Sequence, residues 1–115
     1  MAVNKAIRLD PGNRNRYSGT QGAAYTLLGR WEEAITALKR YMVLRPADIR
    51  AHAYLAVDYV ELGHNDAARA EAAEALRLNP QLTVEMVFPT VSLQRKALPA
   101  EIDRFRADLH TAGIK

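Results

Sequence analysis

The feature that most constrains this chain is the return of its turn and stop residues at a fixed interval of 34 positions. The turn glycine Gly29, for example, recurs as Gly63. Aligning residues 15–48 with residues 49–82 gives seven identities: Arg16/Arg50, Tyr25/Tyr59, Leu28/Leu62, Gly29/Gly63, Ala34/Ala68, Leu44/Leu78 and Pro46/Pro80. Most of them fall where a helical hairpin turns, where its helices cross or where its second helix ends. A period of this length predicts stacked helical hairpins.

The pattern resembles the tetratricopeptide repeat (TPR) family, whose consensus is W-x2-L-G-x2-Y, then A-x3-F, then P. The matches in the first copy are Gly22, Tyr25, Ala34, Leu38 in place of the aromatic residue, and Pro46. Those in the second copy are Leu55, Ala56 in place of the glycine, Tyr59, Ala68 and Pro80. The departures are Ser18 and His52 for tryptophan, Gln21 for leucine, Tyr41 for a small residue and Ala72 for the aromatic residue. The resemblance implies an all-α, TPR-like stack of antiparallel helical hairpins with a C-terminal capping helix.

We expect the chain to divide into four segments. These are the end of a truncated preceding repeat at 1–12, repeats at 13–48 and 49–82, and a degenerate segment with the capping helix at 83–115. Residues 2–9 look like the end of a second helix whose partner is missing, which favours a longer parent array upstream. The apolar side chains left uncovered at this N-terminal edge favour a homodimer contact there.

Hydrophobic spacing and helix-ending signals predict helices at about 14–28, 31–44, 49–62, 66–78 and 99–111. The helix at 66–78 is rich in alanine, at positions 67, 68, 70, 72, 73 and 75. Because alanine fills little volume, we expect Phe105 and Leu109 to cover this helix. Gly22 is expected where two helices cross closely, whereas Gly19 either widens the groove or marks a soft spot.

Length and charge exclude several classes of function. The 115 residues suit one domain, and the formal charge of +3 is not gathered into the dense basic stripe of a nucleic-acid binder. The chain has no cysteine, which fits a cytoplasmic setting. It also has no apolar run of the length that crosses a membrane. We therefore expect neither nucleic-acid nor membrane partners.

No catalytic or metal-binding motif is present. His52, His64 and His110 stand far apart in the sequence, and no glycine-rich phosphate loop occurs. Asp58 and Glu61 lie three positions apart on one predicted helix, a pair that is usually solvated or salt-bridged. We expect no enzyme activity, no cofactor and no metal.

The TPR resemblance implies a concave groove lined by the first helix of each hairpin, where a protein or peptide partner docks. The positions it implies are Arg16, Thr20, Ala23, Leu27, Arg50, Tyr54, Val57 and Glu61. Arg16 and Arg50, one period apart, either form a cationic wall suited to a carboxylate or lie as solvated residues at the rim.

A second resemblance lies at the C-terminal end. Residues 76–85, a spacer and residues 106–114 are similar to the C-terminal end of bacterial signalling proteins in which such repeats follow an adenylate or guanylate cyclase or a winged-helix regulator domain. This resemblance implies a regulatory or scaffolding interaction module of a larger signalling protein. The alternative is a structural spacer or self-association module without a groove ligand.

Overall fold

The structure is a computed structural model that describes the backbone of residues 14–88 and 99–115 and the side chains of residues 19–88 and 102–115. Within these ranges the regular secondary structure is helical: α2 Arg14–Leu27, α3 Trp31–Met42, α4 Ile49–Glu61, α5 Asn65–Leu78, α6 Val84–Val87 and α8 Pro99–Ala112. The five longer helices lie within one or two residues of their predicted bounds. The short helix α6 was not predicted.

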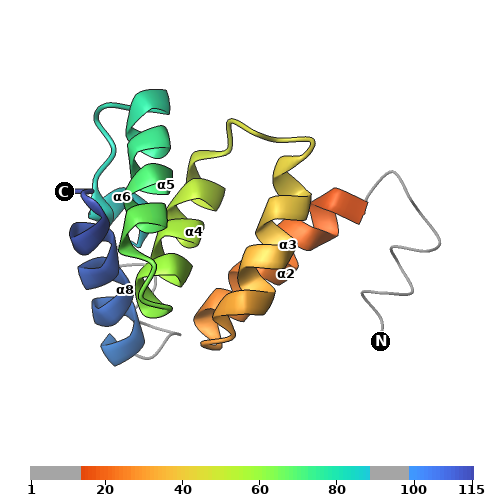
Figure 1. Cartoon of the computed structure of the whole chain (residues 1–115), viewed down its shortest axis with the longest axis horizontal. Coiled ribbons are helices and arrows are strands. Elements are labelled where there is room, and N and C mark those ends of the chain that lie inside the picture. The colour runs from red at the N-terminus through yellow and green to blue at the C-terminus, as the bar shows by residue number, and fades with distance from the viewer. Residues whose placement is uncertain (1–13, 89–98) are drawn as a thin grey trace.

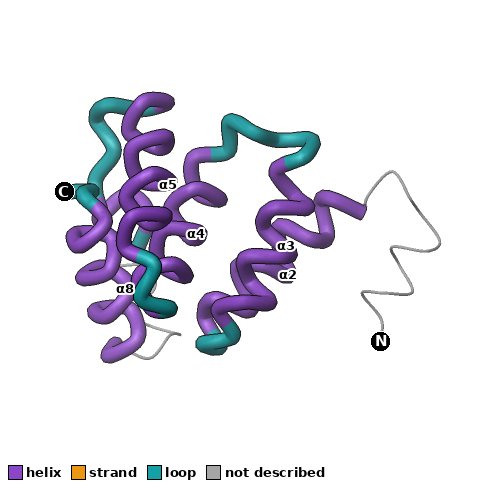
Figure 2. Tube along the Cα trace, viewed as in Figure 1, coloured by secondary structure: helices purple, strands orange, loops and turns teal. Residues whose placement is uncertain are grey.

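The helices form layers that follow one another along the long axis of the molecule. The hairpin α2–α3 lies at one side, the hairpin α4–α5 lies next to it, and α8 packs on the far side of the second hairpin (Figures 1 and 2). Helix α8 contacts both α4 and α5, so it takes the place that a further hairpin would occupy. The predicted all-α stack with a capping helix is confirmed.

Two glycines make the first hairpin possible. A Cβ atom on Gly22 would lie 2.6 Å from Leu38 Cγ, so α2 and α3 cross as closely as predicted. Gly29 has a φ of +77°, a left-handed conformation in which a residue with a side chain is strained. At the next hairpin, Asp48 begins α4 as its N-cap and accepts a hydrogen bond from Ala51 N at 3.1 Å.

The main core lies between the second hairpin and the C-terminal segment. The alanines that α5 turns inward pack in the same cluster as the large side chains of α6 and α8. This cluster includes Ala68, Ala72, Ala75, Val84, Val87, Phe88, Ile102, Phe105 and Leu109. Phe88 and Phe105 have ring centroids 5.6 Å apart, and Trp31 meets Phe105 edge-on at 6.1 Å. The expectation that Phe105 and Leu109 cover the alanine-rich helix is confirmed.

Because Phe105 is fully buried, we expect Phe105→Ala to lower the free energy of unfolding by about 3 kcal/mol or more. Equilibrium urea denaturation measures this value. Leu44→Ala is the control, because Leu44 is 65% exposed and its loss should change stability by less than about 0.5 kcal/mol. Equal effects of the two substitutions would contradict the packing of α8 on α5.

Candidate functional site

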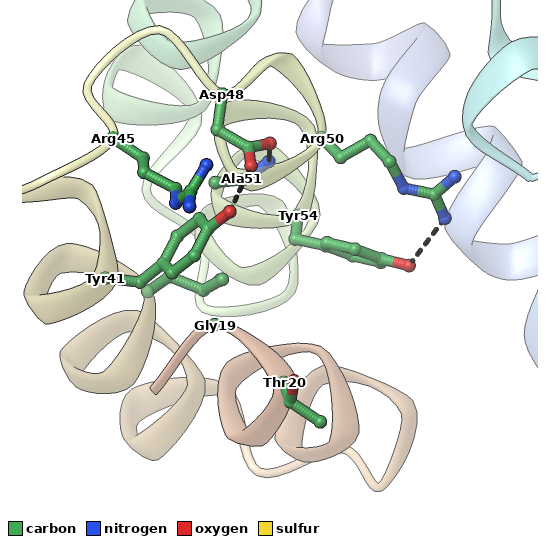
Figure 3. Close-up of a pocket in the computed structure, with 9 residues that line it drawn as sticks. Gly19, Thr20, Tyr41, Arg45, Asp48, Arg50, Ala51 and Tyr54 are labelled. Carbon is green, nitrogen blue, oxygen red and sulfur yellow. Dashed lines mark hydrogen bonds between the residues drawn. The ribbon is translucent and has the colours of Figure 1, made fainter. Parts of the chain in front are cut away.

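The structure brings three of the predicted groove residues together at one pocket of about 320 Å³, where α2, α3 and the start of α4 meet (Figure 3). We call it the inter-repeat pocket. It is lined by Gly19, Thr20, Leu38, Tyr41, Arg45, Asp48, Arg50, Ala51 and Tyr54. Thr20, Arg50 and Tyr54 were predicted to line the groove. Arg45, Tyr41 and Asp48 were missed because the family pattern places the groove on the first helices alone.

A contact between Gly19 and Tyr41 forms the wall of this pocket. A Cβ atom on Gly19 would lie 2.5 Å from Tyr41 Cδ1, so the tyrosine ring fits only because Gly19 has no side chain. Tyr41 donates a hydrogen bond from its hydroxyl to Asp48, the residue that caps α4. This hydrogen bond, together with burial, raises the pKa of Tyr41. Gly19 therefore makes room for a ring that links the first hairpin to the start of the second.

Two arginines reach the pocket from different segments. Arg50 donates a hydrogen bond from Nη2 to the Tyr54 hydroxyl at 3.2 Å, and its guanidinium carbon lies 5.8 Å from the centre of the Tyr54 ring. Arg45 comes from the loop between α3 and α4, and Figure 3 shows its guanidinium near Tyr41, on the other side of the pocket from that of Arg50. The side chain of Arg16 lies outside the described residues.

The groove predicted along the second repeat is closed by the C-terminal segment. Val57 is fully buried in the main core, so the prediction that it lines an open groove is wrong. Tyr54 meets Phe88 edge-on with ring centroids 5.6 Å apart, and Glu61 forms an ion pair with Arg104 at 3.3 Å. Phe88, which follows α6, and Arg104 of α8 thus contact positions where the TPR resemblance implied a ligand.

Along α2, the other predicted groove residues lie away from the inter-repeat pocket. Ala23 is half-buried and Leu27 is 46% exposed, and neither lines the pocket. Of the eight predicted groove residues, three therefore line the inter-repeat pocket, and their role in binding stays a prediction.

A buried carboxyl group joins the two hairpins. Thr26 Oγ on α2 lies 2.8 Å from Asp58 Oδ1 on α4 and 3.2 Å from the Gly22 carbonyl oxygen, and both side chains are fully buried. Burial raises the pKa of Asp58 to about 8, although the hydrogen bond with Thr26 opposes this shift. A hydroxyl has one proton, so Thr26 cannot donate to both neighbours. A protonated Asp58 that donates to Thr26, while Thr26 donates to Gly22, satisfies both contacts. The prediction that Asp58 is solvated or ion-paired is wrong.

A second buried carboxyl group lies between α4 and α8. Burial and a hydrogen bond with Glu61 raise the pKa of Asp108 to about 8, while the charge of Arg104 lowers it. Among the described residues, Asp58 Oδ2 and Asp108 Oδ2 are buried without a hydrogen-bond partner. Ionisation of either carboxyl group would therefore leave a poorly compensated charge inside the protein.

His52, which stands at the tryptophan position of the TPR consensus, is buried. Its Nδ1 lies 2.7 Å from Glu71 Oε1 and its Nε2 lies 2.8 Å from the Pro46 carbonyl oxygen, so it ties α4 to α5 and to the preceding loop. Among the described side chains, no three His, Asp or Glu residues converge in the way a metal site requires. Over the same residues, no helix combines the length and apolar composition needed to cross a membrane.

These features define a TPR-like stack of helical hairpins. A solved structure titled MamA MSR-1 C2, which is TPR-like, matches 96% of this chain with a TM-score of 0.62 and 17% identity. The match covers 66% of that structure, so this chain spans slightly less than two thirds of its length. At this identity the likeness concerns the fold. No protein-family model and no curated protein matches the sequence.

The Gly19–Tyr41 contact can be tested with a double-mutant cycle. An alanine inside a helix is normally about 1 kcal/mol more favourable than glycine. Because its Cβ would overlap the Tyr41 ring, we expect Gly19→Ala to destabilise the chain by about 1–3 kcal/mol. In a Tyr41→Ala background the same change should stabilise it. Urea denaturation measures all four proteins, and an effect of one sign in both backgrounds would contradict the contact.

The buried carboxyl groups predict that stability falls as pH rises. The folded pKa of Asp58, about 8, lies above its ordinary value of 3.8, so the folded state holds a proton that the unfolded state releases between these values. The free energy of unfolding should therefore fall from about pH 5 to about pH 8, and Asp58→Asn should reduce this slope. The measurement is urea denaturation across that range.

Asp66→Asn is the matched control, because the Asp66 side chain is exposed on α5. It should keep the slope of the unaltered chain. If the free energy of unfolding falls with pH equally steeply in Asp58→Asn and Asp66→Asn, Asp58 is not the group that holds the extra proton in the folded state. Asp108→Asn should also flatten the slope, since the pKa of Asp108 is raised in the same direction.

Proposed function

We propose that this chain is a protein-interaction module that binds an extended segment of a partner protein at the inter-repeat pocket. The observation that carries the proposal is the convergence of Thr20, Arg50 and Tyr54, from the first helices of both hairpins, on one open polar and aromatic pocket. Aromatic and arginine side chains are enriched where proteins bind one another. The TPR-like fold supports this function, because stacked hairpins commonly present such surfaces to peptides.

We further propose that the module is the C-terminal, regulatory part of a larger bacterial signalling protein, such as an adenylate or guanylate cyclase. The support is the resemblance of residues 76–85 and 106–114 to the ends of such proteins. In this proposal the fragment itself performs no catalysis. Repeats at 13–48 and 49–82 present the partner to the remainder of the protein.

Self-association is the second candidate function. Large apolar side chains are exposed at both ends of the first hairpin, with Leu28 70% exposed at one end and Val43 73% exposed at the other. Exposed apolar groups of this kind favour contacts between chains. The homodimer contact expected at the N-terminal edge concerns residues 2–9, which lie outside the described residues. Static light scattering over a range of concentrations measures this function directly.

The interaction function is tested by obstructing the pocket without changing its charge. Thr20 is exposed on α2, so Thr20→Trp should fold normally and fill the pocket. Three tagged proteins are used to capture proteins from cell extract: the unaltered chain, Thr20→Trp and the control Ala70→Trp. The control alters an exposed position on α5. We expect a partner retained by the chain and by Ala70→Trp to be lost with Thr20→Trp.

Reconstitution with the purified partner completes the test. Amide hydrogen exchange should slow in α2 and in the first turns of α4 when the partner is added. The proposal would be contradicted if all three proteins retained the same partner and if the partner did not change amide hydrogen exchange in α2 and α4. Concentration-dependent association that Thr20→Trp leaves unchanged would then favour the self-association module.

A further inference from the structure

The arginines of the inter-repeat pocket differ from most of the other arginines with described side chains, because they form no ion pair with a described carboxylate. Five arginines with described side chains form ion pairs with carboxylates: Arg30, Arg69, Arg77, Arg104 and Arg106. Within the described part of the chain, Arg45 and Arg50 form none, and both line the same pocket. Arg40, the other such arginine, lies elsewhere on α3, at a second surface pocket. The inter-repeat pocket therefore gathers two cations whose charge the described residues leave unpaired.

The one acidic side chain in the pocket is already engaged. Asp48 accepts a hydrogen bond from the Tyr41 hydroxyl through Oδ2 and another from Ala51 N through Oδ1. Its charge also faces the positive N-terminal end of α4, which it caps. Asp48 thus holds the pocket together, and the charge presented to a ligand is that of Arg45 and Arg50.

The positions of these groups indicate the shape of the ligand. In Figure 3 the guanidinium groups of Arg45 and Arg50 lie on opposite sides of the pocket, with the side chains of Tyr41, Asp48 and Tyr54 between them. One carboxylate held by both arginines at once does not fit this arrangement. An extended peptide can offer carboxylates at separate points, because alternate residues point to the same side and are spaced by about 6–7 Å. Its carboxylates can then reach separate arginines while the chain between them lies on tyrosine rings.

We propose that the inter-repeat pocket binds an acidic, extended segment of the partner, with one acidic side chain at Arg45 and another at Arg50. This inference rests on the proposed interaction function and specifies its ligand. Guanidinium groups donate paired hydrogen bonds to carboxylates, which gives such a site specificity for acidic side chains. Arg50 is exposed, so the interaction is weakened by salt and of moderate strength.

The probe is a short peptide, blocked at both ends, in which glutamate alternates with alanine. Its reference is the same peptide with glutamine in place of glutamate. Each peptide is titrated into the isotopically labelled chain, and the backbone amide resonances are followed by NMR. We expect saturable shifts in the loop before α4 and in its first turns with the glutamate peptide. The glutamine peptide should bind about tenfold more weakly. Added salt should weaken the binding of the glutamate peptide.

Variants of the protein test the same proposal by removing the charge of the arginines. Arg45→Gln/Arg50→Gln should bind the glutamate peptide about tenfold more weakly, whereas Arg69→Gln, an exposed arginine of α5, should bind it as the unaltered chain does. Circular dichroism checks the fold of each variant. If the double variant fails to fold, the comparison of the two peptides still shows whether the pocket prefers an acidic ligand.

Equal affinity for the glutamate and glutamine peptides, or the absence of saturable shifts at the pocket, would overturn the acidic ligand. This outcome is separate from failure of the interaction function. If Thr20→Trp still abolishes capture of the partner, the pocket binds a ligand of another chemistry. If neither the binding of the peptides nor the capture of the partner depends on the pocket, both proposals are wrong.

Discussion

The structure depends on how the alanine-rich face of α5 is filled. Its inward alanines let α4 and α8 approach closely, but they contribute little volume of their own. Phe88 and Phe105 provide that volume, and their rings meet each other in the same cluster. Trp31 reaches Phe105 from the first hairpin, so the C-terminal segment contacts both repeats. Residues distant in sequence thus complete a core that neither repeat could form alone.

The contacts between the two hairpins include buried polar ones beside an apolar cluster of Leu38, Ala51 and Leu55. Asp58 of α4 meets Thr26 of α2 in a fully buried position, and His52 of α4 contacts the Pro46 carbonyl group in the loop between the hairpins. Within the second hairpin, His52 also contacts Glu71 of α5. Buried polar groups are costly unless they find partners, so these contacts specify one arrangement of the hairpins. The same property makes the interface sensitive to pH, because Asp58 is accommodated best in its protonated form.

Much of the fold could be predicted because the repeat pattern places glycines, small residues and prolines at definite points of a hairpin. The close crossing at Gly22 follows from local rules of this kind. The site was harder to predict because its features depend on pairs of residues far apart in sequence. Tyr41 and Gly19 each depart from favourable local patterns and are explained only by each other. Val57 is buried in a cluster that also contains residues of α8, and no repeat periodicity describes where α8 docks.

Closure of the second-repeat groove has a consequence for recognition. Val57 is buried in the core that the C-terminal segment completes, and Glu61 is paired with Arg104 of α8, so a ligand cannot run along the whole length of α4. On α4, the residues that line the inter-repeat pocket, among them Arg50 and Tyr54, lie instead in the first turns of that helix. A ligand held over such a short length makes few contacts, and its discrimination must come from strong, directional ones. In the proposed binding mode the two arginines provide contacts of this kind, which is why we expect charge, more than length, to decide what this module binds.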